Sequence, residues 1–325
     1  MTEFHDAMTA AGVKALWEQQ DRHHFPPEPA HLWPWRTIDP LIDAAIAATD
    51  MHNAERRVLI LNNPIFHGSE RDGAVVNLAV NLQVLMPGER ARAHRHSMHA
   101  LRFVLEGEGV TTVVEGKPCP MLPGDMILTP GTTWHEHIHE GKGRCVWVDA
   151  LDVPLHRYLR DPVFEPGPAH DLLALPADSS YAAAGLVSAE AAPSTPYSPM
   201  FRYAWAQAKA ALDALPAAPD GSRRLRYVHP LHGGAVMPTL DCYLLGLALQ
   251  QPHQPRLSNC NTVCVVVQGT GWSMVGDQRI EWQAKDIFTL PHNQSATHCA
   301  TSEDAVLFQV TDREILRRLE LLREG

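Results

Sequence analysis

The chain has 325 residues, 45% of them apolar and 20% charged, so it is long enough to form two domains with buried cores. Its net charge of −10, from 37 acidic and 27 basic residues, argues against a nucleic-acid-binding surface. We find no apolar run of about eighteen residues and no basic segment followed by an apolar one at the N-terminus, so we predict neither a membrane span nor a signal peptide. The six cysteines are scattered without a CxxC pair, which favours a cytoplasmic location.

The first half of the chain changes from a helical to a β pattern. Residues 1–55 are predicted to be a helical arm, with an amphipathic helix over 6–22 and a short helix over 38–50. Residues 56–155 hold short apolar runs separated by glycine and proline. That pattern is typical of an all-β sandwich or barrel, so we expect a first β domain there.

A histidine motif lies inside this first β domain. His94-Arg95-His96 is an H-x-H pair, and His135 follows an apolar run closed by Pro130-Gly131. Strand side chains alternate, so both imidazoles of the pair are expected on one face, and pairing across a barrel can bring His135 beside them. Three neutral imidazoles form a metal site with open coordination positions that suits Fe(II) or Zn(II). The alternative is that some of the nineteen histidines cluster by chance.

The second half of the chain consists of a linker and a second β region. Residues 156–226 are rich in alanine, proline and serine and include a helix predicted over 203–215. We expect this segment to be a helical linker between two β domains. Strand patterns return in residues 227–325, which we predict to be the second β domain, ending in an amphipathic helix over 312–324.

The two β regions are an internal repeat. Leu105–Gly109 matches Val267–Gly271, and Gly124–Pro130 matches Lys285–Pro291. Each pair combines an apolar run with turn residues at the same offsets. The sequence therefore predicts two copies of one fold.

The second copy lacks the candidate metal ligands. Superposing the repeats places Arg256, Ser258 and Ala296 opposite the three histidines of the first copy, and only His137 keeps a histidine counterpart, His298. We therefore expect the metal in the first domain. The second domain is interpreted as structural, or as a lid and oligomer surface.

These motifs resemble the bicupin ring-cleaving dioxygenases, which comprise gentisate 1,2-dioxygenase and relatives acting on salicylate and 1-hydroxy-2-naphthoate. The resemblance runs from about Arg56 to the C-terminus. His94–Phe103 resembles the first cupin motif of the family, Leu122–His137 resembles the second, and Trp147–Leu155 is similar to the following strand. Ala100 stands where many cupins carry a glutamate, as in this family, which leaves a three-histidine site.

The resemblance implies an all-β bicupin fold of two jelly-roll (double-stranded β-helix) barrels with a helical arm and linker. It implies one Fe(II) per chain, O2 as co-substrate, and a tetramer. The substrate would bind the metal through its carboxylate and ortho-hydroxyl groups, and the ring would open between the carbons that carry them. For gentisate the product would be maleylpyruvate. A salicylate with a 5-substituent and 1-hydroxy-2-naphthoate are the alternative substrates.

Three residues near the histidines are candidates for the chemistry. Arg102 follows the H-x-H pair by six residues, so its guanidinium is expected to face inward and fork onto a substrate carboxylate, unless it forms a structural ion pair. His137 shares the face of His135 and is a candidate hydrogen-bond partner or proton carrier, although the survival of His298 favours a core histidine. Asp149 is expected to orient Arg102 or a ligand histidine.

The remaining candidate site residues are those that the resemblance implies. Arg57 is expected to reach the substrate, with Arg56 as its rival. The family commonly has a tryptophan before the H-x-H motif, in a stretch like W-A-G-L-Q, where this chain has Ala79-Val80-Asn81-Leu82-Gln83. After the motif, Met98 and His99 stand where the family often has glutamine and serine or threonine. We expect these departures to shape the substrate pocket through Ala79, Asn81, Gln83, Met98 and His99.

Two other classes of function compete with this interpretation. A cupin with a different role would be a sugar isomerase, a storage protein or a ligand-binding regulator, but we find no helix-turn-helix signal or basic face for a regulator. A zinc hydrolase also fits three histidines and a water, with Glu136 or His137 as its base. Iron content with O2 consumption separates the dioxygenase from both classes.

Overall fold

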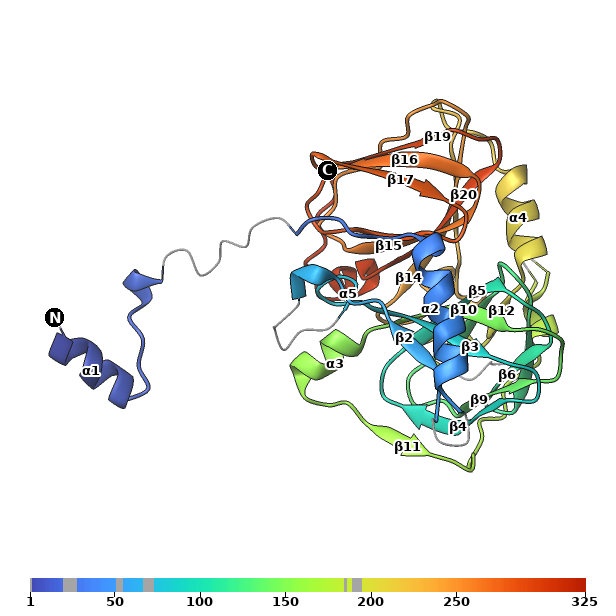
Figure 1. The fold of residues 1–325 in the computed structure, drawn as a ribbon, viewed down its shortest axis with the longest axis horizontal. Coiled ribbons are helices and arrows are strands. Elements are labelled where there is room, and N and C mark those ends of the chain that lie inside the picture. The colour runs from blue at the N-terminus through green and yellow to red at the C-terminus, as the bar shows by residue number, and fades with distance from the viewer. Residues whose placement is uncertain (1, 20–27, 51–54, 67–72, 184–185, 189–194) are drawn as a thin grey trace.

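The computed structural model describes residues 2–19, 28–50, 55–66, 73–183, 186–188 and 195–325. Its strands form two β units, each made of two sheets, and they lie one above the other in Figure 1. The predicted all-β bicupin fold is therefore confirmed.

The first unit contains the H-x-H motif. Its larger sheet has the strand order β12-β8-β5-β10-β3-β2, and its smaller sheet has the order β11-β4-β9-β6-β7. Neighbouring strands in both sheets are antiparallel. The strands are β2 (Val58–Ile60), β3 (Ala79–Leu85), β4 (Arg90–His96), β5 (Ala100–Glu106), β6 (Val110–Val114), β7 (Lys117–Met121), β8 (Met126–Thr129), β9 (His135–His139), β10 (Cys145–Leu151), β11 (Phe164–Pro166) and β12 (Arg202–Tyr203).

The second unit repeats this plan with fewer strands. Its larger sheet has the order β1-β18-β15-β20-β14-β13, and its smaller sheet has the order β17-β16-β19. The strands are β1 (Leu32–Trp33), β13 (Arg223–Arg226), β14 (Asp241–Leu247), β15 (Thr262–Gln268), β16 (Thr270–Val275), β17 (Gln278–Gln283), β18 (Ile287–Leu290), β19 (Ala296–Ala300) and β20 (Ala305–Thr311).

The internal repeat is visible in the hydrogen-bond register. The pairing of β5 with β10 shifts between Val146 and Trp147, and the pairing of β15 with β20 shifts between Val266 and Gln268, at the matching point of each unit. Just after the shifts, Gly107 and Gly269 have φ angles of 89° and 86°. A Cβ atom on Gly107 would lie 2.4 Å from the carbonyl oxygen of Arg144. The glycines recognised in the sequence are thus required by the same turn in both units.

The arm and the linker add strands to both units. β1 of the arm pairs with β18 of the second unit, whereas β11 and β12 of the linker pair with β4 and β8 of the first unit. The pairing of these short pieces with the two units was not predicted, because strands of two or three residues carry too little alternation to be recognised.

The N-terminal helix is shorter than the sequence predicted, whereas the helix expected over 38–50 runs from Trp35 to Ala48. The helix expected over 6–22 begins at Thr2 and ends at Ala10, because Gly12 has a φ of 67° and closes the helix with hydrogen bonds from Gly12 to Thr9 and from Val13 to Met8. Residues 20–22 of that prediction lie outside the described residues. No helix of the described residues is long and apolar enough to cross a membrane. The helices are α1 (Thr2–Ala10), α2 (Trp35–Ala48), α3 (Val153–Leu159), α4 (Trp205–Ala214) and α5 (Arg313–Arg318), with 3-10 turns η1 (Leu16–Glu18), η3 (Pro64–Phe66) and η4 (Asp178–Tyr181).

The C-terminal helix also stops early. It was expected over 312–324, but Glu320 adopts a φ of 58° and Leu321 donates back to the carbonyl of Leu316. This is the same left-handed closure as in α1, made here by a residue other than glycine. Because glutamate carries no signal for such a turn, the sequence could not indicate it.

Two buried aspartates at matching positions join the units. Asp152, between β10 and α3, accepts hydrogen bonds from the Thr239 hydroxyl (2.6 Å) and from the His99 backbone N–H (2.9 Å). Asp312, between β20 and α5, accepts a hydrogen bond from the Asn77 side chain at 2.5 Å. Each aspartate therefore binds a group of the other unit. Phe103 of the first unit also stacks on Phe308 of the second unit, with ring centroids 4.1 Å apart.

We predict that Asp312→Ala lowers the free energy of unfolding by roughly 3 kcal/mol or more, because it leaves two buried donors of Asn261 and one half-buried donor of Asn77 without an acceptor. Urea unfolding measures the effect. Glu303→Ala, an exposed carboxylate of the same unit, is the control and should change stability by no more than about 0.5 kcal/mol. Equal stability of the two variants would show that the Asp312 network does not hold the units together.

Candidate metal centre

The three candidate histidines meet between two strands of the smaller sheet. His94 and His96 are buried on the same face of β4, as strand alternation predicts, and His94 lies opposite His135 in the register with β9. One ring nitrogen of each histidine lies within 4.8 Å of the others. The ring centroids of His94 and His135 are 4.3 Å apart, and those of His96 and His135 are 4.9 Å apart. The site therefore comes from two strands that are about forty residues apart in the chain.

The three rings are held in the orientation that a metal requires. Each Nδ1 lies within hydrogen-bond distance of a backbone carbonyl oxygen two residues away, so Nδ1 carries the proton and Nε2 keeps its lone pair. The pairs are His94 with Arg92 (2.8 Å), His96 with Met98 (2.8 Å) and His135 with Thr133 (3.0 Å).

The electrostatics of the site keep the imidazoles neutral. Burial lowers the pKa of His94 to about 4 and that of His96 to about 3, and it lowers the pKa of His135 well below its usual value. Neutral imidazole is the form that binds a metal ion. The Nε2 atom of His135 is buried and has no hydrogen-bond partner in the described part of the chain, which is a costly arrangement unless a ligand uses its lone pair. The donor set therefore fits a divalent transition metal such as Fe(II) or Zn(II).

A cavity of about 520 Å³ opens beside these histidines. That volume is in the range of sites for small organic ligands. The larger sheet of the first unit supplies much of its wall. Its lining residues are Glu55, Arg56, Val58, Ile60, Asn81, Gln83, His96, Met98, Ala100, Arg102, Asp149, Leu151, Val153 and Phe164.

Arg102 is the buried cation of this cavity. It is paired in register with Asp149, and its Nε lies 3.4 Å from an Asp149 carboxylate oxygen. Its guanidinium also donates to the Thr129 hydroxyl, and the indole N–H of Trp147 donates to Asp149 at 3.1 Å. Burial raises the pKa of Asp149, and the charge of Arg102 opposes that rise. Asp149 therefore lies beside Arg102, and its orienting role stays a prediction.

The cavity wall also holds unpaired polar atoms. Asn81 Oδ1 and Gln83 Nε2 are buried and have no hydrogen-bond partner among the described residues. Both side chains point into the cavity from β3, together with the buried guanidinium of Arg102. Buried polar groups are rarely left unpaired, so this wall is suited to a polar ligand.

Arg56, and not Arg57, faces the cavity. Arg56 lines it and approaches Nε2 of His94 to 3.3 Å. Arg57 points the other way, where it is buried in an ion pair with Glu89 (2.8 Å) and donates to the carbonyl of Thr49. The placement of Arg57 at the substrate was therefore wrong: Arg56, Val58 and Ile60 line the cavity, so alternate side chains face it and Arg57, directly before β2, points away.

Two of the five predicted pocket residues lie outside the lining. Asn81, Gln83 and Met98 line the cavity, whereas Ala79 is buried at the far end of β3 and does not. His99 turns to the other side of the chain, where its Nδ1 accepts a hydrogen bond from the backbone N–H of Gly131 (3.0 Å). His99 lies three residues after His96, so strand alternation points it away from the cavity that Met98, Ala100 and Arg102 line, and its expected place in the pocket rested on the resemblance.

His137 has the surroundings of a core histidine. Its Nδ1 lies 2.8 Å from the Thr112 hydroxyl, and burial lowers its pKa well below the usual value. Its counterpart His298, in the unit without metal ligands, has the same arrangement with Ser273 at 2.7 Å. A shared packing role explains both contacts, and the predicted catalytic role of His137 stays a prediction.

Phe164 belongs to the site and was not predicted. It lies on β11 of the linker, where its ring stacks on His94 at 5.3 Å and also lies 5.3 Å from the guanidinium carbon of Arg56. The only signal in the sequence is the apolar pair Val163-Phe164 between two prolines. That pair was assigned to the linker because its strand is too short to recognise.

The comparisons with known proteins agree with this geometry. The family model described as "Cupin domain" matches residues 81–153. The gentisate 1,2-dioxygenase 1 of Aquipseudomonas alcaligenes is 33% identical, and the match covers 99% of this chain and 95% of that protein. The 5-aminosalicylate 1,2-dioxygenase of a Comamonas species is 33% identical, with 98% and 88% covered.

Solved structures extend the likeness to the whole fold. The salicylate 1,2-dioxygenase of Pseudaminobacter salicylatoxidans matches with a TM-score of 0.92 and 30% identity, covering 100% of this chain and 97% of that one. A structure of the same enzyme described as an adduct with gentisate matches with a TM-score of 0.91 and 29% identity, with 100% and 93% covered. The cupin fold, the histidine site and these full-length matches together show that the chain belongs to the family of ring-cleaving 1,2-dioxygenases that includes the gentisate and salicylate enzymes.

Proposed function

We propose that this dioxygenase holds one Fe(II) on His94, His96 and His135 and uses O2 to cleave the ring of a 2-hydroxybenzoate between the carboxylated and hydroxylated carbons. Gentisate is the substrate that the relatives support best. The observation that carries the proposal is the set of three neutral, buried imidazoles beside a cavity that contains a buried guanidinium.

The protein ligands leave room for the substrate. A ferrous ion held by three histidines keeps open coordination positions and supplies the one-electron chemistry that O2 requires. The chain itself contributes binding and orientation. Arg102 binds the substrate carboxylate through two parallel hydrogen bonds. Asp149 holds the guanidinium group in position and balances its charge.

The remaining lining residues recognise the rest of the ring. Asn81 and Gln83 present unpaired polar atoms, Arg56 adds a second cation, and Met98 and Phe164 supply apolar surface. Relatives are named for gentisate, 5-aminosalicylate and 1-hydroxy-2-naphthoate, which differ in the size and the ring substituents that a substrate pocket must accommodate. The alternative to gentisate is therefore the same reaction on a 5-substituted salicylate or on 1-hydroxy-2-naphthoate.

The tetramer implied by the resemblance and the cytoplasmic location favoured by the scattered cysteines stay predictions. Light scattering coupled to size-exclusion chromatography measures the first, and cell fractionation measures the second.

We predict that His135→Ala abolishes iron retention and turnover, because it removes one of three protein ligands and leaves the other two on one strand. Metal analysis of anaerobically purified protein measures the effect. His232→Ala, which changes an exposed histidine of the second unit, is the control and should keep its iron. Normal iron content and rate in the His135 variant would refute the ligand assignment.

We predict that Arg102→Lys weakens substrate binding by roughly 1–3 kcal/mol, because lysine keeps the charge but loses the bidentate fork. The measurement compares binding of a salicylate with binding of the phenol that lacks its carboxylate. Arg95→Lys, on the outer face of β4 and paired with Glu165, is the matched control. If wild type and Arg102→Lys discriminate equally between the two compounds, Arg102 has a structural role only.

We predict that Arg56 and Arg57 respond differently to replacement by alanine. Arg56→Ala should raise KM with little loss of stability, because its guanidinium lines the cavity. Arg57→Ala should lower the free energy of unfolding by about 3 kcal/mol or more, because it leaves Glu89 without its partner. Steady-state kinetics and urea unfolding are measured on both variants. A raised KM in Arg57→Ala with a loss of stability in Arg56→Ala would show that Arg57, and not Arg56, serves the cavity.

A further inference from the structure

The second unit keeps a cavity at the place that corresponds to the metal pocket. Its volume is also about 520 Å³. The equivalence follows from the strand register: β2 pairs with β3 as β13 pairs with β14, and β3 pairs with β10 as β14 pairs with β20. By this register Asn81 and Asp149 of the first cavity correspond to Tyr243 and Gln309, which line the second. The two cavities are therefore the same pocket in two copies of one fold.

The second pocket carries arginine side chains at positions where the first pocket has aliphatic ones. In the register, Val58 and Ile60 of the first pocket correspond to Arg224 and Arg226. Val153, the first residue of α3, corresponds to Arg313, the first residue of α5.

The metal ligands have changed as well. Arg256, Ser258 and Ala296, which stand opposite the three histidines, all line the second pocket. No imidazole replaces the missing ligands at these three positions, so they offer no metal site. Four lining positions that hold aliphatic or imidazole groups in the first unit thus carry guanidinium groups in the second.

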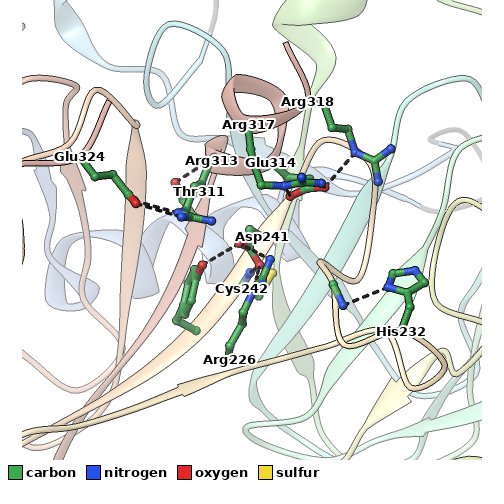
Figure 2. Close-up of polar contacts among 12 residues, drawn as sticks. Arg226, His232, Asp241, Cys242, Thr311, Arg313, Glu314, Arg317, Arg318 and Glu324 are labelled. Atoms are coloured by element: carbon green, nitrogen blue, oxygen red, sulfur yellow. Dashed lines mark hydrogen bonds and ion pairs between the residues drawn. The ribbon is translucent and has the colours of Figure 1, made fainter. Parts of the chain in front are cut away.

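Of these four arginines, two form an ion pair with a carboxylate of the described residues. Arg226 pairs with Asp241 through two bonds of 2.9 Å, and Arg313 pairs with Glu324 at 2.8 and 2.9 Å, as Figure 2 shows. Arg224 instead lies over the ring of Tyr243 at 3.9 Å. Neither Arg224 nor Arg256 forms an ion pair with a carboxylate of the described residues.

We propose that this pocket binds a small organic anion through a carboxylate or phosphate group held by Arg224 and Arg256. The guanidinium fork matches the geometry of both groups, and the excess of positive charge favours a dianion. Apolar side chains of Leu245 and Leu290 line the same cavity, which suits the carbon part of the ligand. The second unit is then a binding domain and not only a structural copy.

Isothermal titration calorimetry of the metal-loaded enzyme tests the proposal, with maleate and inorganic phosphate as separate probes at low ionic strength. We expect one equivalent of at least one probe to bind. Arg224→Gln combined with Arg256→Gln should weaken that binding about tenfold or more, because both charged forks are lost. The probe that binds more tightly identifies the carboxylate or the phosphate as the preferred group.

Two single variants separate this pocket from the rest of the protein. Arg279→Gln removes another exposed arginine of the second unit, one that lies over Trp272 outside the cavity, and should leave binding unchanged. Arg102→Gln disables the cation of the metal pocket and should also leave it unchanged. Binding that survives the double variant, binding that is lost in Arg102→Gln, or no binding of either probe to the wild type would overturn the proposal. The test uses no turnover, so its result is independent of the function proposed for the metal pocket.

Discussion

The metal centre depends on three hydrogen bonds from imidazole Nδ1 atoms to backbone carbonyls. Each carbonyl belongs to a residue two positions from its histidine, so the local strand and turn geometry fixes the tautomer and the direction of each ring. The pairing of β4 with β9 then brings the Nε2 lone pairs to one point in a buried pocket. Burial keeps the imidazoles neutral, and the same burial makes an unused lone pair costly. The site is thus prepared for a metal by the fold itself.

The internal repeat separates what the fold needs from what the chemistry needs. Both units keep the register shift, the glycine with positive φ, the core histidine bonded to a hydroxyl, and the buried aspartate that binds the other unit. These shared features belong to the scaffold. The metal ligands and the cation-bearing positions of the pocket differ between the units, and they determine what each pocket binds. A reaction centre and a charged cavity have therefore been built on one architecture.

Much of this arrangement could be predicted from the sequence, because it rests on short-range patterns. The H-x-H pair, the repeat and the family motifs indicated the fold. They also predicted that the three histidines and Arg102 face the same site. The errors have local causes. His99 was placed in the pocket by the resemblance although strand alternation points it away, and Arg57 lies directly before a strand of only three residues. Phe164 reaches the site from a strand of three residues in the linker, and its contact with His94 depends on tertiary pairing that no local pattern encodes.

If this pocket activates O2 for ring cleavage, oxygen uptake measured with an electrode shows it directly. Anaerobically purified protein loaded with Fe(II) is given gentisate, with a 5-substituted salicylate and 1-hydroxy-2-naphthoate in parallel. We expect stoichiometric consumption of O2 with at least one of these compounds, and none when the same protein carries Zn(II). No O2 uptake with any of the three compounds, or equal turnover with Zn(II), would contradict it.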